Sequence, residues 1–302
     1  MLGFAYLQDV SPATKNLMYL FSLYVLLSAL MNFFFALFRA VEEMHHETRI
    51  SFFMNAILVM VALFLGVYHA PLWLIAAVFI GSRFIGLILA IVEGERLVSL
   101  RSFKLVFGRP EDLVQMSVFG LHALFGNLFF VQDTILLSWW AGDHQVGVYQ
   151  AVFKVVVLGL MISDVSFYAI LPVLSRLHRE NTGQWIAVGR LLHKTLLFVS
   201  LPIAFVCIVF ADQVIGILYG AKAYEEAVPL LRVFGWIIIV RYIAEPSGML
   251  LTSSRRQLAR LVVVCLAVVL NFIGNVYAIN KFGVMGAGVV PLVTNIFVCC
   301  GY

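Results

Sequence analysis

Residues 50–68 read ISFFMNAILVMVALFLGVY, and residues 72–91, after three intervening positions, read LWLIAAVFIGSRFIGLILAI. Each run has roughly the 20 apolar residues with which an α-helix crosses a hydrocarbon core about 30 Å thick. The runs are continuous rather than alternating, so they do not fit the strands of a membrane barrel. Because a backbone in lipid must satisfy its own hydrogen bonds, this stretch predicts a transmembrane helical hairpin.

The remainder of the chain has the same character. Hydrophobic residues make up 63% of the 302 positions and charged residues 12%, against roughly 45–50% and about 25% in a soluble domain. A soluble fold could not bury so much apolar surface, so we expect an all-α, polytopic membrane helix bundle of about nine spans. The expected spans are 16–38, 50–68, 72–91, 113–137, 146–171, 191–210, 228–251, 261–278 and 284–300.

Lysine and arginine alternate from loop to loop along the chain. They gather in 39–49, 92–112, 172–190 and 252–260. The segments between them, 69–71, 138–145, 211–227 and 279–283, carry one such residue or none. This pattern follows the positive-inside rule and predicts that the basic loops face the cytoplasm and that the first span runs inward. The net charge of +4 therefore reports topology, and no nucleic-acid partner is expected.

Several ionisable side chains lie inside these spans, where they are costly and usually face a bundle interior or an aqueous cavity. Three of these residues are cations, and we interpret them as contacts for an anionic headgroup: Arg83, Lys154 and Arg241. The acids are candidates for ion coupling or for ion pairs, and they are Asp133, Asp164 and Glu245. The alternative, in which neutralised pairs only hold helices together, stays open at this point.

Position along the helices relates some of these residues to one another. Asp133 and Lys154 lie 10 and 11 residues to either side of Asp143, in the segment 138–145 that carries no Lys or Arg, so we expect them at one depth, where they could pair. Glu245 follows Arg241 by one helical turn on the same face. Arg232, close to the outer boundary of its span, is expected to snorkel to the interface.

Other polar residues are expected to be structural. His122 is interpreted as a satisfied residue of the bundle. Glu42, Glu43, His45 and His46 look like a metal cluster but are expected to form a solvated loop, so no metal site is predicted. The chain contains no HExxH, GxSxG, Walker or GxGxxG motif. We therefore expect neither an enzyme nor a bound cofactor.

Five segments together resemble bacterial polysaccharide flippases of the multidrug, oligosaccharidyl-lipid and polysaccharide exporter superfamily. They are DTILLSWWAGDHQVGVYQAVFKVV from Asp133, ILPVLSRLHRE from Ile170, FADQVIGILYGAKAYEEAVPLLRVFGW from Phe210, LLTSSRRQ from Leu250 and AVVLNFIGNVYAINKFGVMGAGVV from Ala267. Each motif is loose, and their order and spacing carry the resemblance, which covers most of residues 16–300. A weak internal repeat, between 38–68 and 250–277, is also typical of two-lobed transporters.

The resemblance implies a two-lobed transporter fold of about 12 or 14 helices, with six in each lobe. In that frame residues 1–95 are a partial N-terminal lobe of three helices, 96–112 a cytoplasmic connection, and 113–302 a six-helix C-terminal lobe. We therefore expect the chain to be truncated relative to the family.

The resemblance also implies a function. Such flippases translocate undecaprenyl-pyrophosphate-linked oligosaccharide across the bacterial cytoplasmic membrane for surface polysaccharides such as O-antigen. The implied partners are the lipid-linked oligosaccharide, membrane lipid and a proton or sodium ion. The alternatives are a cation-coupled multidrug antiporter of the same superfamily, a membrane polysaccharide polymerase or ligase, and a structural membrane subunit. Outer loops no longer than about 17 residues disfavour a polymerase or ligase, and the buried charges disfavour a structural subunit.

Overall fold

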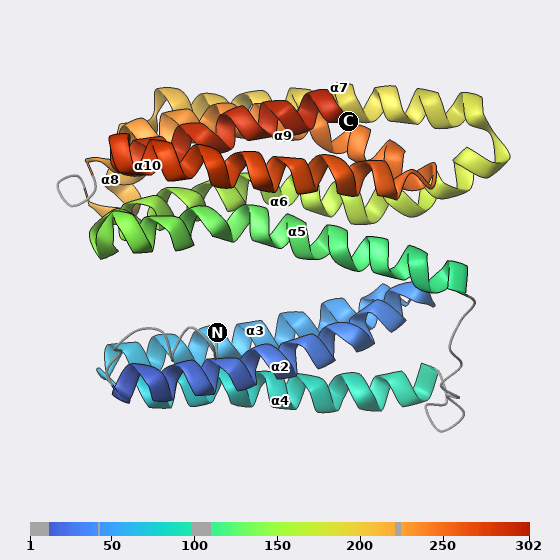
Figure 1. Cartoon of the computed structure of the whole chain (residues 1–302). Helices are drawn as coiled ribbons and strands as arrows, with labels where there is room; N and C mark the ends of the chain where they lie inside the picture. Colours follow the sequence, from blue (N-terminus) through green and yellow to red (C-terminus); the bar gives the residue numbers. More distant parts are fainter. Residues whose placement is uncertain (1–11, 42, 98–109, 221–224) are drawn as a thin grey trace. The chain divides into compact units, whose positions relative to one another are not determined.

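The structure is a computed structural model that describes residues 12–41, 43–97, 110–220 and 225–302 (Figure 1). Its helices are α2 (Pro12–Ala40), α3 (Met44–Val67), α4 (Leu72–Leu97), α5 (Pro110–Trp140), α6 (Gly142–Glu180), α7 (Thr182–Val209), α8 (Ala211–Tyr219), α9 (Ala227–Ser253) and α10 (Gln257–Gly301). Within the described residues, eight helices are long and apolar enough to cross a membrane. The predicted all-α, multi-pass bundle is therefore confirmed.

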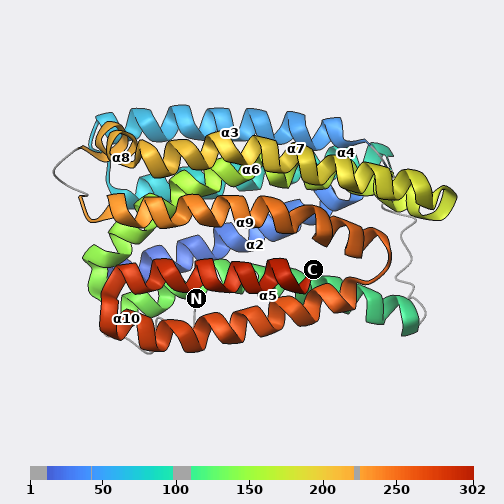
Figure 2. The same ribbon diagram turned by 90° about the horizontal axis from the view of Figure 1, so that it is seen from above.

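The shape of α10 explains why eight helices accommodate nine expected spans. Its backbone leaves the helical region at Gly283, where φ is 57° and ψ is −136°, and the chain folds back there (Figure 2). Glycine tolerates this left-handed φ because it has no Cβ. The Val284 N–H, at the start of the second arm, donates to Gln145 Oε1 at 2.8 Å. The predicted spans 261–278 and 284–300 are the two arms of this hairpin.

Two expected loops are largely helical. α6 continues through Pro172 to Glu180, and α7 begins two residues later. The side chain of Asn181 accepts a hydrogen bond from the Gln184 N–H at 3.0 Å and so caps α7. The apolar run marks only the part of a helix that lies in lipid, and the polar residues after it continue the helix beyond that part. The segment 211–227 likewise contains the short helix α8.

The chain packs as two compact units, residues 1–107 and 108–302. In the described part of the chain, unit 1 holds α2, α3 and α4, and α4 packs against both of the others. Most of the predicted connection 96–112 falls on 98–109, outside the described residues. The assignment of the units to the lobes of a transporter stays a prediction.

Unit 2 is built around α9, which packs against α6, α7 and α10. The fully buried Tyr242 of α9 donates a hydrogen bond to the Gly159 carbonyl of α6 at 2.5 Å. The α5–α6 turn, α8 and the Gly283 turn lie at one end of this unit, and the α6–α7 and α9–α10 connections lie at the other (Figure 1). Unit 2 therefore separates the basic connections from the charge-poor ones, as the loop charges predict.

Candidate functional site

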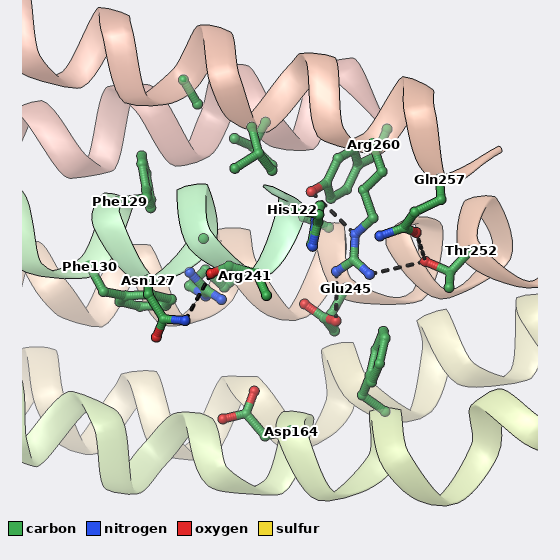
Figure 3. Close-up of a pocket in the computed structure, with 18 of the residues that line it drawn as sticks. His122, Asn127, Phe129, Phe130, Asp164, Arg241, Glu245, Thr252, Gln257 and Arg260 are labelled. Atoms are coloured by element: carbon green, nitrogen blue, oxygen red, sulfur yellow. Dashed lines mark hydrogen bonds and ion pairs between the residues drawn. The ribbon is translucent and has the colours of Figure 1, made fainter. Parts of the chain in front are cut away.

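A cavity of about 650 Å³ lies inside unit 2, between α5, α6, α9 and α10 (Figure 3). Aromatic rings, among them Phe129, Phe130 and Phe167, line part of its wall. Its polar lining consists of His122, Asn127, Asp164, Arg241, Glu245, Thr252, Gln257, Arg260 and Asn295. Three of the six predicted site residues, Asp164, Arg241 and Glu245, thus line one space.

Arg241 projects into this cavity from α9. Its guanidinium carbon lies 4.4 Å from the centroid of the Phe130 ring, in a cation–π arrangement. No carboxylate lies within ion-pair distance of it among the described residues. The site therefore holds a cation that packs against a neutral ring.

Glu245, one turn further along α9, is paired with a residue that the sequence reading placed elsewhere. Its Oε1 lies 3.3 Å from Nη2 of Arg260, and only 15% and 9% of the two side chains are exposed. Arg260 also donates to the Thr252 hydroxyl at 3.1 Å and to the Tyr302 hydroxyl at 3.4 Å. A Cβ at Gly248 would stand 3.0 Å from the Arg260 guanidinium, so this glycine lets Arg260 lie against α9.

Assigning Arg260 to the basic loop 252–260 was wrong, because α10 already begins at Gln257 and Arg260 lies in its first turn. A usable signal was present in the sequence. The buried residues of the first arm of α10 recur every three or four positions: Gln257, Arg260, Leu261, Val264, Ala267, Val268, Asn271 and Asn275. Arg260 belongs to this inward stripe, whereas Arg255 and Arg256 are exposed.

Two other polar residues, Asp164 and His122, also line the cavity. Asp164 of α6 is exposed and lies across the cavity from Glu245 (Figure 3), and no hydrogen bond or ion pair from it is formed within the described residues. His122 was expected to be satisfied within the bundle, and this is wrong for one ring nitrogen. Its Nε2 is buried without a hydrogen-bond partner in the described part of the chain, and the residue also contributes to the cavity lining.

Asp133 is not in the large cavity but in a buried polar network, and 3% of it is exposed. Its Oδ2 accepts from the Tyr149 hydroxyl at 2.8 Å and its Oδ1 from Asn275 Nδ2 at 2.6 Å. The same nitrogen donates to Asn271 Oδ1 at 2.6 Å, and Asn271 in turn donates to the Thr294 hydroxyl at 3.4 Å. The side-chain amide oxygen of Asn275, Oδ1, is buried and has no partner among the described residues.

A second cavity of about 20 Å³ touches both Asp133 and Arg241. It shares Phe129, Phe130 and Asn295 with the wall of the large cavity. A space of this size is enough for about one water molecule. The buried network and the large cavity are thus neighbours.

The predicted ion pair between Asp133 and Lys154 is not formed. Asp133 lies level with Tyr149, and the adjacent Thr134 accepts from Gln150 at 2.7 Å. Lys154 follows Tyr149 by five residues, which turns it by about 140° around α6, and its side chain is exposed. The estimate of depth placed the α5–α6 turn too late and ignored this rotation.

Arg83 lies in unit 1, on α4. Its guanidinium donates to the Tyr24 hydroxyl at 3.1 and 3.2 Å and to Asn55 Oδ1 at 3.4 Å. Both partners are neutral, and no ion pair to Arg83 occurs within the described residues. Arg83 is therefore a second cation held by neutral groups.

Comparison with known proteins gives the following matches. A profile of a family described as polysaccharide biosynthesis proteins matches residues 9–229. The chain is 25% identical over 217 residues to a protein of Haloferax volcanii named a probable low-salt glycan biosynthesis flippase. That alignment covers 71% of this chain and 46% of the relative, so the chain spans less than half of the relative's length. No solved structure matches the chain significantly.

Proposed function

The chain belongs to the polysaccharide biosynthesis protein family, and on that basis we propose that it acts in a flippase that translocates a lipid-linked oligosaccharide. The observation that carries this proposal is the position of Arg241, which lies in a cavity of about 650 Å³ without a carboxylate at ion-pair distance among the described residues. A cation within a membrane protein is costly unless an anion neutralises it. A pyrophosphate headgroup would supply that anion.

The finer identity of the substrate belongs to the same proposal. The proposed carrier lipid is undecaprenyl pyrophosphate, the proposed membrane is the bacterial cytoplasmic membrane, and the proposed product is a surface polysaccharide. Guanidinium groups suit the phosphates because they donate bidentate, charge-assisted hydrogen bonds. Arg241 is the proposed contact in unit 2. Arg83 is a separate candidate for a headgroup contact in unit 1. Lys154 is not proposed as a contact in this cavity, because its side chain is exposed on α6 and does not line the cavity.

Asp133 is the proposed ion-coupling residue, in preference to Asp164 and Glu245. The Glu245 carboxylate already neutralises Arg260, and Asp164 is exposed to the cavity. Asp133 is buried and accepts from the side-chain nitrogen of Asn275, whose own oxygen has no partner among the described residues. A sodium ion would be held by the Asp133 carboxylate if the Asn275 amide turned this oxygen toward it, and the carboxylate could alternatively take a proton. The small cavity beside Arg241 would bring the ion near the headgroup.

The test is to replace Arg241 by Gln in the native gene and to measure export of the oligosaccharide and the amount of protein in the membrane. We expect export to fall at least about tenfold, the loss that one charge-assisted hydrogen bond implies, with protein abundance unchanged. The matched control is Arg232→Gln on the same helix. Arg232 forms an ion pair with Asp212 at 2.7 Å, is half exposed, and lies outside the cavity, so the control should export normally.

Normal export by Arg241→Gln at normal abundance would contradict the proposal. The multidrug antiporter is the competing reading, since the cavity also presents acids and aromatic rings to an organic cation. It would be favoured if deleting the gene raised sensitivity to cationic drugs and left export of the oligosaccharide intact.

A further inference from the structure

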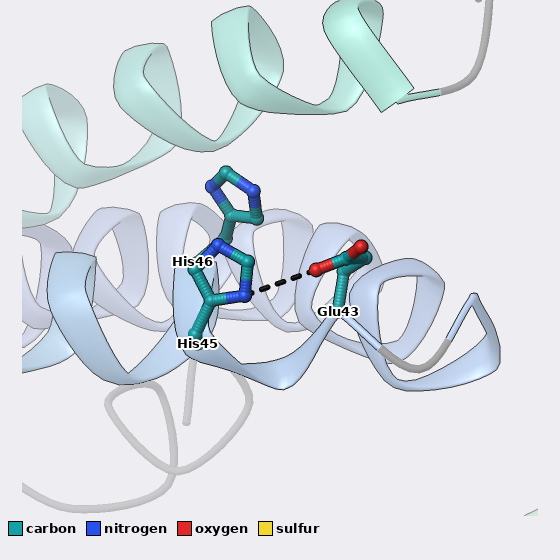
Figure 4. Close-up of side chains that lie close together, drawn as sticks. All are labelled: Glu43, His45 and His46. Carbon is teal, nitrogen blue, oxygen red and sulfur yellow. Dashed lines mark ion pairs between the residues drawn. The ribbon is translucent and has the colours of Figure 1, made fainter.

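The connection between α2 and α3 in unit 1 places three metal-ligand side chains together. The ligand atoms of Glu43, His45 and His46 all lie within 4.8 Å of one another (Figure 4). The backbone fixes this arrangement, since the Glu43 N–H donates to the Phe38 carbonyl at 2.9 Å and the His46 N–H to the Glu43 carbonyl at 3.3 Å. Glu43 is the N-cap of α3, and His45 and His46 lie in its first turn. The predicted loop is therefore helical at the two histidines, while Glu43 and His45 stay solvated, with 45% and 65% of their side chains exposed.

The Glu43 carboxylate is not used by the helix that it precedes. Glu43 occupies the N-cap position of α3, yet its side chain makes no capping hydrogen bond. Its Oε2 lies instead 3.0 Å from His45 Nδ1. The His45 ring in turn lies beside the His46 ring, with 4.1 Å between their centroids.

His46 carries a nitrogen with no hydrogen-bond partner. Its Nδ1 is buried and makes no hydrogen bond within the described residues, although Glu93 Oε2 of α4 lies 3.5 Å away. Only 15% of the His46 side chain is exposed. A buried polar atom without a partner costs free energy, and a metal ion bound to this nitrogen would remove that cost.

The neighbouring arginines are already neutralised by other acids. Arg39 forms two hydrogen bonds with Glu47, at 2.7 and 2.8 Å. Arg49 is bound by Glu93 at 2.9 Å. Among the described residues, Glu43 contacts His45 and has no arginine or lysine at ion-pair distance, which keeps its negative charge available to a cation.

We propose that Glu43, His45 and His46 bind a divalent transition-metal ion of the Zn²⁺ type. Two imidazoles and a carboxylate form a ligand set that zinc accepts, with a water or Glu93 in the fourth position. Magnesium and calcium are poorer candidates, because they prefer oxygen ligands throughout. Ligands about 2.0–2.2 Å from a tetrahedral ion lie closer together than 4.8 Å, so the side chains would rotate inward on binding. Through Glu93, the ion would connect the α2–α3 turn to α4.

The test is a titration of the purified full chain, carrying no histidine tag, with Co²⁺ and then Zn²⁺ in detergent. We expect one Co²⁺ per chain, with the visible absorption of a tetrahedral site, and displacement by Zn²⁺. His45→Gln and Glu43→Gln should each weaken binding at least as much as the loss of an outer partner does, about 10–100-fold. The matched control is His144→Gln, an exposed histidine in unit 2, which should bind as the wild type does.

His46→Gln alters a largely buried side chain and is informative only if the variant stays folded. His45→Gln and Glu43→Gln alter side chains that are 65% and 45% exposed, so they test the site without that difficulty. Wild-type binding by the folded Glu43→Gln and His45→Gln variants would overturn the proposal. So would the absence of stoichiometric Co²⁺ binding by the folded wild-type chain, or an equal loss of binding in His144→Gln.

Discussion

Arg260 and Glu245 form a buried ion pair, 3.3 Å from nitrogen to oxygen, between the first turn of α10 and the middle of α9. Removing one partner of such a pair leaves an uncompensated charge and costs about 3–5 kcal/mol. Glu245→Gln should therefore lower the thermal stability of the purified chain. The double variant Glu245→Gln with Arg260→Gln should recover part of that loss, because neither charge remains.

The matched comparison for this pair is Arg176 with Glu180, an exposed pair 4.0 Å apart on α6. Exposed pairs contribute at most about 1 kcal/mol, so Arg176→Gln should leave thermal stability almost unchanged. Equal effects of Glu245→Gln and Arg176→Gln would show that the Arg260–Glu245 pair has no special role.

Arg241 should matter for binding more than for folding, because it packs against the neutral ring of Phe130 and forms no ion pair within the described residues. We expect Arg241→Gln to weaken binding of undecaprenyl pyrophosphate by about tenfold or more, since a charge-assisted hydrogen bond contributes about 1.5–3 kcal/mol. Arg241→Lys should weaken binding less than Arg241→Gln does, because lysine keeps the positive charge but lacks the two parallel N–H donors of the guanidinium. Native mass spectrometry of the chain in detergent would measure both. An unchanged affinity in Arg241→Gln would remove this residue from the site.

Two substitutions of Asp133 should distinguish a role of this residue in ion binding from a role in folding. Asn at this position can accept from Asn275 through its side-chain oxygen and donate to the Tyr149 hydroxyl through its nitrogen. Ala leaves the buried Tyr149 hydroxyl without its acceptor, at about 1–3 kcal/mol, whereas Asn275 keeps its hydrogen bond to Asn271. We expect Asp133→Ala to lower the yield of folded protein and Asp133→Asn to retain it. If sodium is the coupling ion, raising its concentration should raise the thermal stability of the wild type and not of Asp133→Asn. Equal stabilisation of both by sodium would exclude Asp133 as its ligand.

Lys154 should be dispensable for folding. Its side chain is exposed on α6 and is not paired with Asp133, so Lys154→Ala should change stability by no more than about 0.5 kcal/mol. Exchanging the two residues should not rescue the Asp133→Ala defect. The yield and thermal stability of the three variants would decide the point, and a rescue by exchange would restore the pairing that the structure contradicts.

The spans were predictable because lipid imposes length and polarity on them, and the runs around residues 50–68 and 72–91 show this directly. Rotation around the helices was harder to predict. Lys154 was placed at the depth of Asp133, but Tyr149 lies at that depth, and the five-residue step from Tyr149 to Lys154 displaces Lys154 along α6 and turns it to another face. Arg260 was missed because Arg255, Arg256 and Arg260 lie close together between two apolar runs and look like one basic loop. Of the three, only Arg260 lies on the buried stripe of α10.

The hairpin of α10 sets the geometry of the polar network through a single turn. Asn271 and Asn275 lie on the arm before Gly283, and Thr294 lies on the arm after it. The distance between these amide and hydroxyl oxygens therefore depends on the angle at which the two arms meet. Gln145, from the start of α6, holds that angle by accepting the Val284 N–H. A movement of the α5–α6 turn would open or close the arms, so the geometry of the Asn271–Asn275–Thr294 network is mechanically linked to the conformation of the charge-poor end of unit 2.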